Sequence, residues 1–165
     1  VLFPHKQFDK IVTAFASQFK ENPMIKLTIV GDGPEMKRLK KLCKNLGVED
    51  RVRLTGKLSR SETAAEVASS DVLICYSNCE TFGVPIIEGW ACGLPVIATT
   101  AASVRDGWDE RLGVQVSPDS IEELKQSMSY VYEHRDKYSS EYIIKYAKDH
   151  YSEQTIYNVL MGYYS

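Results

Sequence analysis

The sequence predicts an α/β fold, a Rossmann-like three-layer α/β/α arrangement around a parallel sheet. Short apolar segments alternate along the chain with segments whose apolar residues recur at helical spacing. The short segments are apolar almost throughout, which is typical of parallel strands that helices cover on both faces. Because parallel crossovers are right-handed, a doubly wound sheet is the economical arrangement. The 165 residues suffice for one domain with a substantial core.

Each element follows from a local pattern of apolar residues and of residues that begin or end helices. Strands are predicted at 27–30, 51–56, 71–77, 94–99 and 113–117. Helices are predicted at 36–46, after Ser59, at 83–92, from Asp119 or Ser120 to about 133, at 137–149 and at 152–163. Ser59 and Glu62 form a capping-box pattern, and Gly47 is a suitable residue to end the helix before it. The opening residues 1–3 are interpreted as the middle of a strand, so the chain is expected to be a fragment of a longer protein.

Composition excludes several classes of protein. The formal net charge of −2 gives no overall attraction to nucleic acid or to anionic membranes. No apolar run approaches the 18 or so residues of a membrane-spanning helix. Cysteines 43, 75, 79 and 92 are interpreted as reduced thiols of a cytoplasmic protein, with a metal site as the lesser alternative.

The strand-to-helix loops are the places to seek a ligand, because doubly wound sheets bind ligands at the carboxyl ends of their strands. These loops are 3–8, 30–34, 55–59, 76–84 and 99–106. In VGDGP (30–34), Gly31 and Gly33 allow a ligand to approach the backbone closely. A plain tight turn explains this short pattern equally well.

The loop 76–84 leads into a helix whose first turn contains Pro85. The backbone N–H groups of Phe82, Gly83 and Val84 can then converge on one anion. Glu80 lies just before this helix and Glu88 lies about one turn inside it. Two carboxylates beside an anion site suit a ligand that carries sugars on both sides of a phosphate. Alternatively, both carboxylates only cap the helix and favour its dipole.

The segment ETFGVPIIEGWACGLPVIAT (80–99) closely resembles the signature of retaining glycosyltransferases of family 4, the glycogen-synthase-like group with the GT-B fold. Three more segments resemble landmarks of that family in the same order along the chain. They are FPHKQFDKIVTAF (3–15), KLTIVGDGPE (26–35) and VRLTGKLS (52–59). The resemblance covers about residues 1–118 and implies the C-terminal, donor-binding half of a GT-B enzyme, occupying 1–165 without the N-terminal acceptor half.

The resemblance also implies roles for individual residues. Glu80 would bond the donor sugar on the reacting side, and Glu88 would take the ribose hydroxyls of the nucleotide. The N–H groups of Phe82, Gly83 and Val84 would hold the pyrophosphate, with Gly31 and Gly33 nearby. Lys6 would neutralise the pyrophosphate as the nucleoside diphosphate leaves. The nucleobase would lie against the loop formed by Thr55, Gly56, Lys57 and Leu58. No metal and no other cofactor is expected, and UDP is favoured over GDP.

The chain departs from the family pattern at several positions. Val1 stands where the family usually has an Arg, and Gln7 replaces the usual Gly after the Lys. The loop 99–113 is short and lacks the usual Pro-Glu, and Ala101 and Ala102 stand where glycines are frequent. These departures put half of a basic clamp, and the loop itself, in question.

Other functions stay open at this point. A nucleotide-sugar epimerase of the same fold and a non-catalytic nucleotide-binding module are the alternatives, whereas an oxidoreductase is disfavoured because residues 3–8 contain no glycine. The expected partners are a nucleotide-sugar donor and, through the other half, a saccharide or glycolipid acceptor, with no nucleic acid. The basic residues Lys37, Arg38, Lys40, Lys41 and Lys44 could meet the inner face of a membrane, although a solvated polar face is the simpler interpretation.

Overall fold

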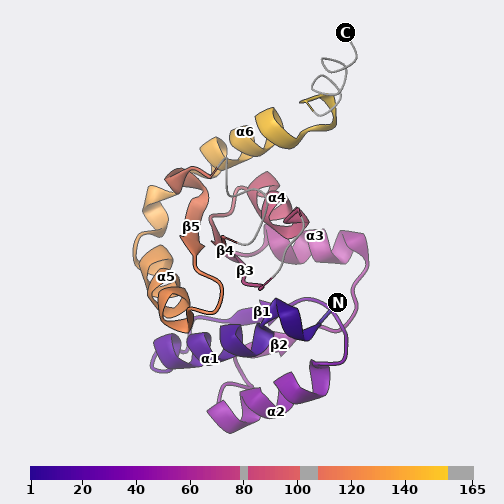
Figure 1. The fold of residues 1–165 in the computed structure, drawn as a ribbon, viewed down its shortest axis with the longest axis vertical. Coiled ribbons are helices and arrows are strands. Elements are labelled where there is room, and N and C mark those ends of the chain that lie inside the picture. The colour runs from indigo at the N-terminus through magenta and orange to yellow at the C-terminus, as the bar shows by residue number, and fades with distance from the viewer. Residues whose placement is uncertain (79–81, 101–107, 156–165) are drawn as a thin grey trace.

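The computed structural model describes residues 1–78, 82–100 and 108–155 (Figure 1). Its strands are β1 (Leu27–Ile29), β2 (Val52–Leu54), β3 (Leu73–Cys75), β4 (Val96–Thr99) and β5 (Gly113–Val116). Its α-helices are α1 (Phe8–Phe19), α2 (Met36–Leu46), α3 (Arg60–Ala68), α4 (Val84–Ala91), α5 (Ile121–Glu133) and α6 (Ser140–Tyr151). Short 3₁₀ turns occur at η1 (Pro4–Lys6), η3 (Glu110–Leu112) and η4 (Arg135–Lys137).

All paired strands are parallel, as predicted, but they form two sheets, one of two strands and one of three, in place of one continuous sheet. β1 pairs with β2, and β4 lies between β3 and β5. Within the described residues no ladder joins β1 to β3. The registers bring the carboxyl ends of paired strands level, with Ile29 opposite Leu54 and Cys75 opposite Ala98.

The strand β4 shows why its sequence is apolar throughout. All of its residues are buried. Ile97 packs into one hydrophobic cluster, whereas Val96 and Ala98 pack into another. Because successive side chains of a strand point to opposite faces, both faces of the sheet are covered here. Helices α1, α2 and α5 contribute to the first cluster, and α4 and α6 to the second, which is the expected three-layer α/β arrangement.

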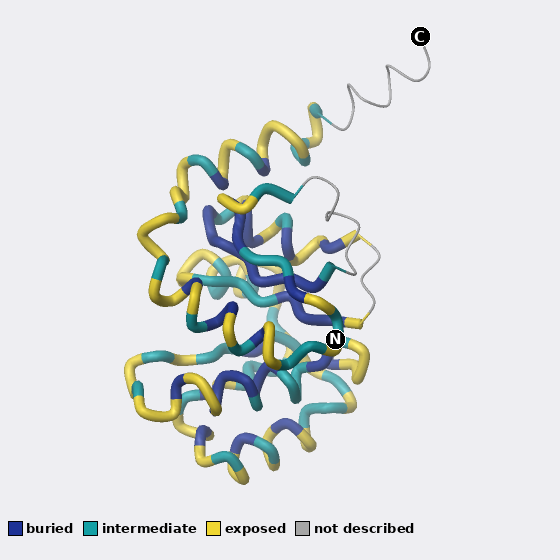
Figure 2. The backbone as a smooth tube through the Cα atoms, turned by 60° about the vertical axis from the view of Figure 1, so that its left-hand side comes forward, coloured by how far each residue is buried: buried dark blue, intermediate teal, exposed yellow. Residues whose placement is uncertain are grey.

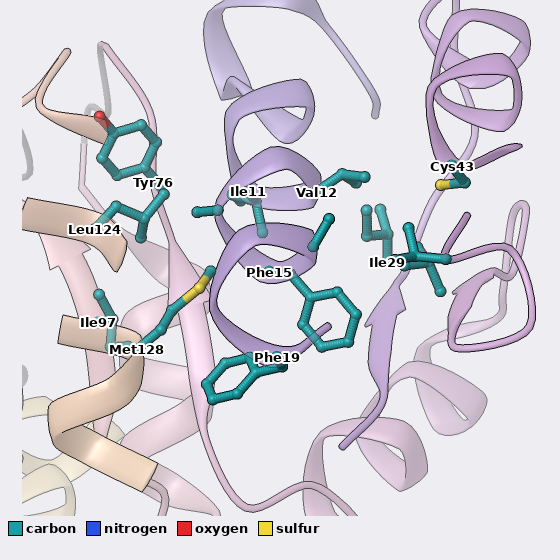
Figure 3. Packing of buried hydrophobic residues seen from close by; sticks show 14 of the residues in the cluster. Ile11, Val12, Phe15, Phe19, Ile29, Cys43, Tyr76, Ile97, Leu124 and Met128 are labelled. Atoms are coloured by element: carbon teal, nitrogen blue, oxygen red, sulfur yellow. The ribbon is translucent and has the colours of Figure 1, made fainter. Parts of the chain in front are cut away.

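Helix α1 is the centre of the larger cluster (Figure 3). Its Ile11 and Phe19 lie beside Met128 of α5, while Val12 and Phe15 lie toward Ile29 of β1. One helix therefore packs against both groups of strands. Figure 2 shows the same division, with buried positions through the interior and exposed positions along the outer faces of the helices.

Local sequence signals for the helix ends are confirmed. Ser59 and Glu62 form both bonds of a capping box at the start of α3. Gly47 takes a left-handed conformation, φ 66°, after α2. Of the two candidates for the start of α5, Ser120 is the cap, and its hydroxyl accepts a bond from the N–H of Glu123.

The interpretation of residues 1–3 as a strand is wrong. Leu2 is buried, but its N–H donates to the carbonyl of Asp32 and its own carbonyl accepts from the N–H of Glu35. The backbone of Leu2 is thus paired with a turn and not with a ladder, and Pro4, which has no N–H, follows at once in η1. The predicted helix at 137–149 begins later, at Ser140, and most of the one predicted at 152–163 lies outside the described residues.

Candidate functional site

The first part of the chain connects loops that belong to the two separate sheets. Leu2 bonds the turn after β1, with an N–O distance of 2.9 Å from its N–H to the carbonyl of Asp32. Three residues later, the carbonyl of His5 accepts from the N–H of Asn78, in the loop after β3, at 3.0 Å. Residues 2–7 therefore cross the carboxyl edge of the sheet between two of the loops predicted to bind a ligand.

The turns after β1 and β2 are bonded to each other. The N–H of Gly31 donates to the carbonyl of Gly56 at 3.1 Å, and the hydroxyl of Thr55 donates to that same carbonyl at 2.8 Å. Gly56 has a positive φ of 74° and open space beside its Cα. Lys57 is exposed and Leu58 is half-buried. The predicted base-binding residues thus form a tied loop next to the Gly31 turn.

Gly33 has a structural reason to be glycine. A Cβ at this position would lie 2.8 Å from both the N and the O of Leu2, which is closer than real Cβ atoms come. At Gly33, therefore, the backbone of Leu2 makes the close approach that the sequence analysis expected of a ligand. Gly31, with φ 127°, takes a conformation that side-chain-bearing residues rarely adopt.

The start of α4 carries the predicted anion site. Gly83 precedes the helix in a left-handed conformation, φ 82°, and is buried. Its neighbours Phe82 and Val84 are about half exposed, at 49% and 53%. Pro85 lies in the first turn, as predicted. Gly83 thus turns the chain into a helix whose first turn is open to the carboxyl edge of the sheet.

Glu88 is exposed on α4, one helical turn after Val84. Side chains four residues apart share a helix face, so Glu88 lies on the same open side as Val84. Trp90 lies about 200° from Glu88 around the helix axis and is fully buried. Glu88 thus lies within α4, one turn from its start, as the sequence analysis expected, and its role toward a ligand stays a prediction.

Lys6 is half-buried at the end of η1. The next residue, Gln7, has a left-handed φ of 47° and is 4% exposed, although it carries a polar side chain. Its amide nitrogen donates to the side-chain oxygen of Asn78, and its own Oε1 is buried without a hydrogen-bond partner. The sequence analysis missed this contact, since no local pattern relates residues 71 positions apart.

Some predicted positions lie outside the described residues. Glu80, the predicted sugar-binding carboxylate, is among them, as are Cys79 and the alanines at 101 and 102. Among the described residues, the segment that carries Lys6 is bonded to the turn after β1 through Leu2 and to the loop after β3 through His5. The role of Glu80 is left to the sequence argument.

The inner end of α4 is fixed by aromatic packing and an indole hydrogen bond. Trp90 packs against Trp108, Tyr146 and Tyr151, with ring centroids 5.3, 5.7 and 6.0 Å away. The indole N–H of Trp90 donates to the carbonyl of Leu112 at 3.1 Å. This cluster attaches α4 to η3 and α6.

A surface clasp adjoins the aromatic cluster. The hydroxyl of Tyr142 donates to Asp109 at 2.7 Å, and the guanidinium of Arg111 lies 4.0 Å from the centre of the Tyr142 ring. Hydrogen bonds from Arg111 are the largest cause that holds the pKa of Asp109 well below its ordinary value of 3.8; burial opposes them, and the hydrogen bond from Tyr142 adds to the lowering.

The hollows of the surface lie elsewhere. One of about 290 Å³ lies between β5 and α5, and another of about 230 Å³ lies between α1 and α2. Neither is lined by a predicted site residue. The described part of the candidate site therefore consists of loops and the first turn of α4, outside both hollows. Among the described residues, no group of three His, Cys, Asp or Glu is arranged to hold a metal ion.

Residues 1–150 match the protein family described as Glycosyl transferases group 1. The chain belongs to this family. This membership confirms the resemblance to glycosyltransferases that was found in the sequence.

Relatives within the glycosyl transferase family are named for different donors and glycolipids. The chain is 40% identical over 93 residues to an alpha-monoglucosyldiacylglycerol synthase of Streptococcus pneumoniae, a match that covers 56% of this chain and 21% of that protein. It is 30% identical over 144 residues to a GDP-mannose-dependent alpha-(1-6)-phosphatidylinositol monomannoside mannosyltransferase of Mycobacterium tuberculosis, which covers 82% of this chain and 37% of that protein.

Solved structures show the same fold. HepE of Anabaena, crystallised with UDP-glucose, superposes with a TM-score of 0.83 at 24% identity over 98% of this chain and 46% of HepE. The chain thus spans less than half the length of these proteins. No helix in the described part of this glycosyl transferase chain is long and apolar enough to cross a membrane.

Proposed function

We propose that this chain is the donor-binding domain of a retaining glycosyltransferase, and that it binds a nucleoside-diphosphate sugar at the carboxyl edge of its sheet. The observation that carries the proposal is the start of α4. There Gly83 turns the chain into a helix with an open first turn, and Glu88 stands exposed one turn further on. A helix start favours an anion, and a nearby carboxylate accepts from hydroxyls, so the pair suits a nucleoside diphosphate.

The donor lies across this edge in the proposed complex. Its pyrophosphate meets the N–H groups of Phe82, Gly83 and Val84, and its ribose hydroxyls donate to Glu88. Lys6 supplies positive charge from the other side, since its turn is bonded to Asn78 in the loop before α4. Positive charge placed where the leaving diphosphate develops negative charge lowers the barrier to transfer. Glu80 is assigned to the donor sugar through the family resemblance.

The nucleobase lies against Thr55 to Leu58 in this proposal, and main-chain groups make most of its contacts. Relatives and neighbours name both kinds of donor, UDP-glucose for HepE and GDP-mannose for the mycobacterial enzyme. A UDP-sugar is our first choice and a GDP-sugar the second. No metal takes part in this proposal, because the helix start and Lys6 balance the charge of the diphosphate.

Transfer itself is proposed to need a second domain. GT-B enzymes hold the acceptor in a cleft between two domains, and this chain matches the donor-binding one. We expect the isolated chain to bind the nucleotide and to transfer sugar hardly at all. The acceptor is proposed to be a saccharide or a glycolipid, in keeping with the glycolipids that appear in the names of two relatives, monoglucosyldiacylglycerol and phosphatidylinositol monomannoside.

Calorimetric titration of the chain with UDP, GDP, ADP and free uridine tests this proposal. One diphosphate should bind, and uridine should bind much more weakly because it lacks the anion. Lys6→Gln should weaken binding of the diphosphate by about 1–2 kcal/mol, the value of a charge-assisted contact that is partly exposed. It should leave the binding of uridine unchanged. Lys26→Gln is the matched control, since Lys26 is exposed at the opposite, amino end of β1. Equal binding of uridine and UDP would contradict the proposal.

A further inference from the structure

Helix α2 carries four lysines on one exposed face, at Lys37, Lys40, Lys41 and Lys44. We call these four residues the lysine face. Their spacing of three, four and seven residues places them within an arc of about 100° on the helix. The buried residues of α2, Leu39 and Cys43, lie on the opposite side. The positive charge is thus concentrated in one direction, away from the core.

The lysine face differs from its neighbour Arg38 in its ion pairs. No ion pair within the described part of the chain involves any of its four lysines. Arg38, beside them on the same helix, is different, since it pairs with Asp9 at 2.6 Å and with Glu35. The chain as a whole is slightly acidic, with a net charge of −2, so this concentration of charge is local.

Four like charges at these separations repel one another, and an external anionic surface relieves that repulsion. Lysine ammonium groups on flexible stems act as point charges and do not impose the fork geometry of arginine. The lysine face contains no aromatic residue, and its Lys41 borders the groove between α1 and α2. Such a face suits a diffuse anionic surface better than one specific phosphate.

We propose that the lysine face docks the domain on anionic lipid headgroups of a membrane surface. Helix α2 lies at the end of the molecule opposite α6 (Figure 1) and begins directly after the turn that contains Gly31 and Gly33. Docking through α2 lays this helix along the lipid surface, with its first turn at the carboxyl edge of the sheet. The reason for such a position rests on the proposed function, because an enzyme with a lipid-linked acceptor meets that acceptor at the membrane.

Co-sedimentation with vesicles tests this docking. The chain should sediment with vesicles of phosphatidylcholine that contain phosphatidylglycerol, and not with phosphatidylcholine alone. Removing four lysines from an anionic surface should lower the partition coefficient by at least tenfold at low salt. Raising the salt concentration should release the wild-type chain, since exposed charges are screened.

The test variant is Lys37→Gln, Lys40→Gln, Lys41→Gln and Lys44→Gln combined, because glutamine preserves helix propensity. The matched control changes four exposed lysines elsewhere, Lys20, Lys26, Lys137 and Lys148, to glutamine and so removes the same charge. Loss of vesicle binding in the α2 variant, with binding retained in the control, is the expected result. No binding by the wild-type chain, or equal loss in both variants, would overturn the docking proposal.

Titration of the same α2 variant with UDP and GDP separates this proposal from the proposed function. The variant should keep the wild-type affinity for nucleotide while losing the vesicles. A chain that binds vesicles but no nucleotide would overturn the donor-binding role and leave the docking surface standing. Thermal unfolding of both four-lysine variants, followed by circular dichroism, shows whether either has lost its fold.

Discussion

The two sides of α4 differ sharply. One side presents Val84 and Glu88 to solvent at the carboxyl edge of the sheet. The other side buries Trp90 completely among aromatic rings and fixes it with a hydrogen bond to Leu112. The helix is eight residues long, so both sides depend on the same two turns.

This difference shows how a short helix can carry an open site. An isolated helix of this length is unstable in water, so tertiary packing must hold α4 in place. The aromatic side supplies that packing, and the exposed side is left free to meet a ligand. Changes on the packed side should therefore alter stability first, and changes on the open side should alter binding alone.

Among these variants, Trp90→Ala should have the largest effect on stability. Removing a fully buried Trp should lower the free energy of unfolding by about 3–5 kcal/mol, since both its packing and its bond to Leu112 are lost. Urea denaturation followed by circular dichroism measures this change. Tyr130→Ala, at an aromatic position that is 44% exposed on α5, is the control and should cost far less. Equal losses would contradict the supporting role of the aromatic cluster.

The contact between Gln7 and Asn78 should show an asymmetry. Asn78→Ala should cost about 1–3 kcal/mol of stability because it leaves the buried amide of Gln7 unpaired. Gln7→Gly should be nearly neutral, since it removes the buried amide and glycine adopts the φ of 47° without strain. Added to Gln7→Gly, the Asn78→Ala substitution should therefore lower the free energy of unfolding much less than it does in the wild type. Urea unfolding of all four proteins forms the cycle, and additive costs would refute this account of the contact.

Asp109→Asn should have the smallest effect, about 1 kcal/mol, because its partner Arg111 is largely exposed. The folded-state pKa of Asp109 is depressed, so its contribution is complete above the ordinary value of 3.8 and fades as pH falls toward the lowered one. The stability difference between wild type and variant should be visible at pH 7 and should shrink below about pH 4. A difference that stays constant down to pH 2 would show that the carboxylate charge is not what stabilises the clasp.

The sequence predicted most of the elements because their signals are local. Apolar runs, the Ser59 capping box and Gly47 each act within a few residues. The division into two sheets and the path of residues 1–3 depend on contacts with residues that are distant in sequence. Leu2 is a good strand residue by composition, yet its backbone bonds the turn at Asp32 and Glu35.

The candidate site divides in the same way. The start of α4 could be read from the Gly-x-Pro pattern and from the spacing of Glu88, since helix geometry relates them directly. The link between Gln7 and Asn78 could not, because tertiary folding alone brings them together. The only available signal was that Gln7 stands where the family usually has a glycine, and that signal gave no partner.

The most direct test of the account is one variant, Glu88→Ala, measured both for nucleotide affinity and for stability. If Glu88 holds the ribose, affinity for the nucleotide that the wild type binds should fall by about 1–3 kcal/mol in calorimetry. The free energy of unfolding should change by no more than about 0.5 kcal/mol, because Glu88 is exposed on the open side. Unchanged affinity together with a clear loss of stability would mean that Glu88 serves the helix, and the open side of α4 would then not be the nucleotide site.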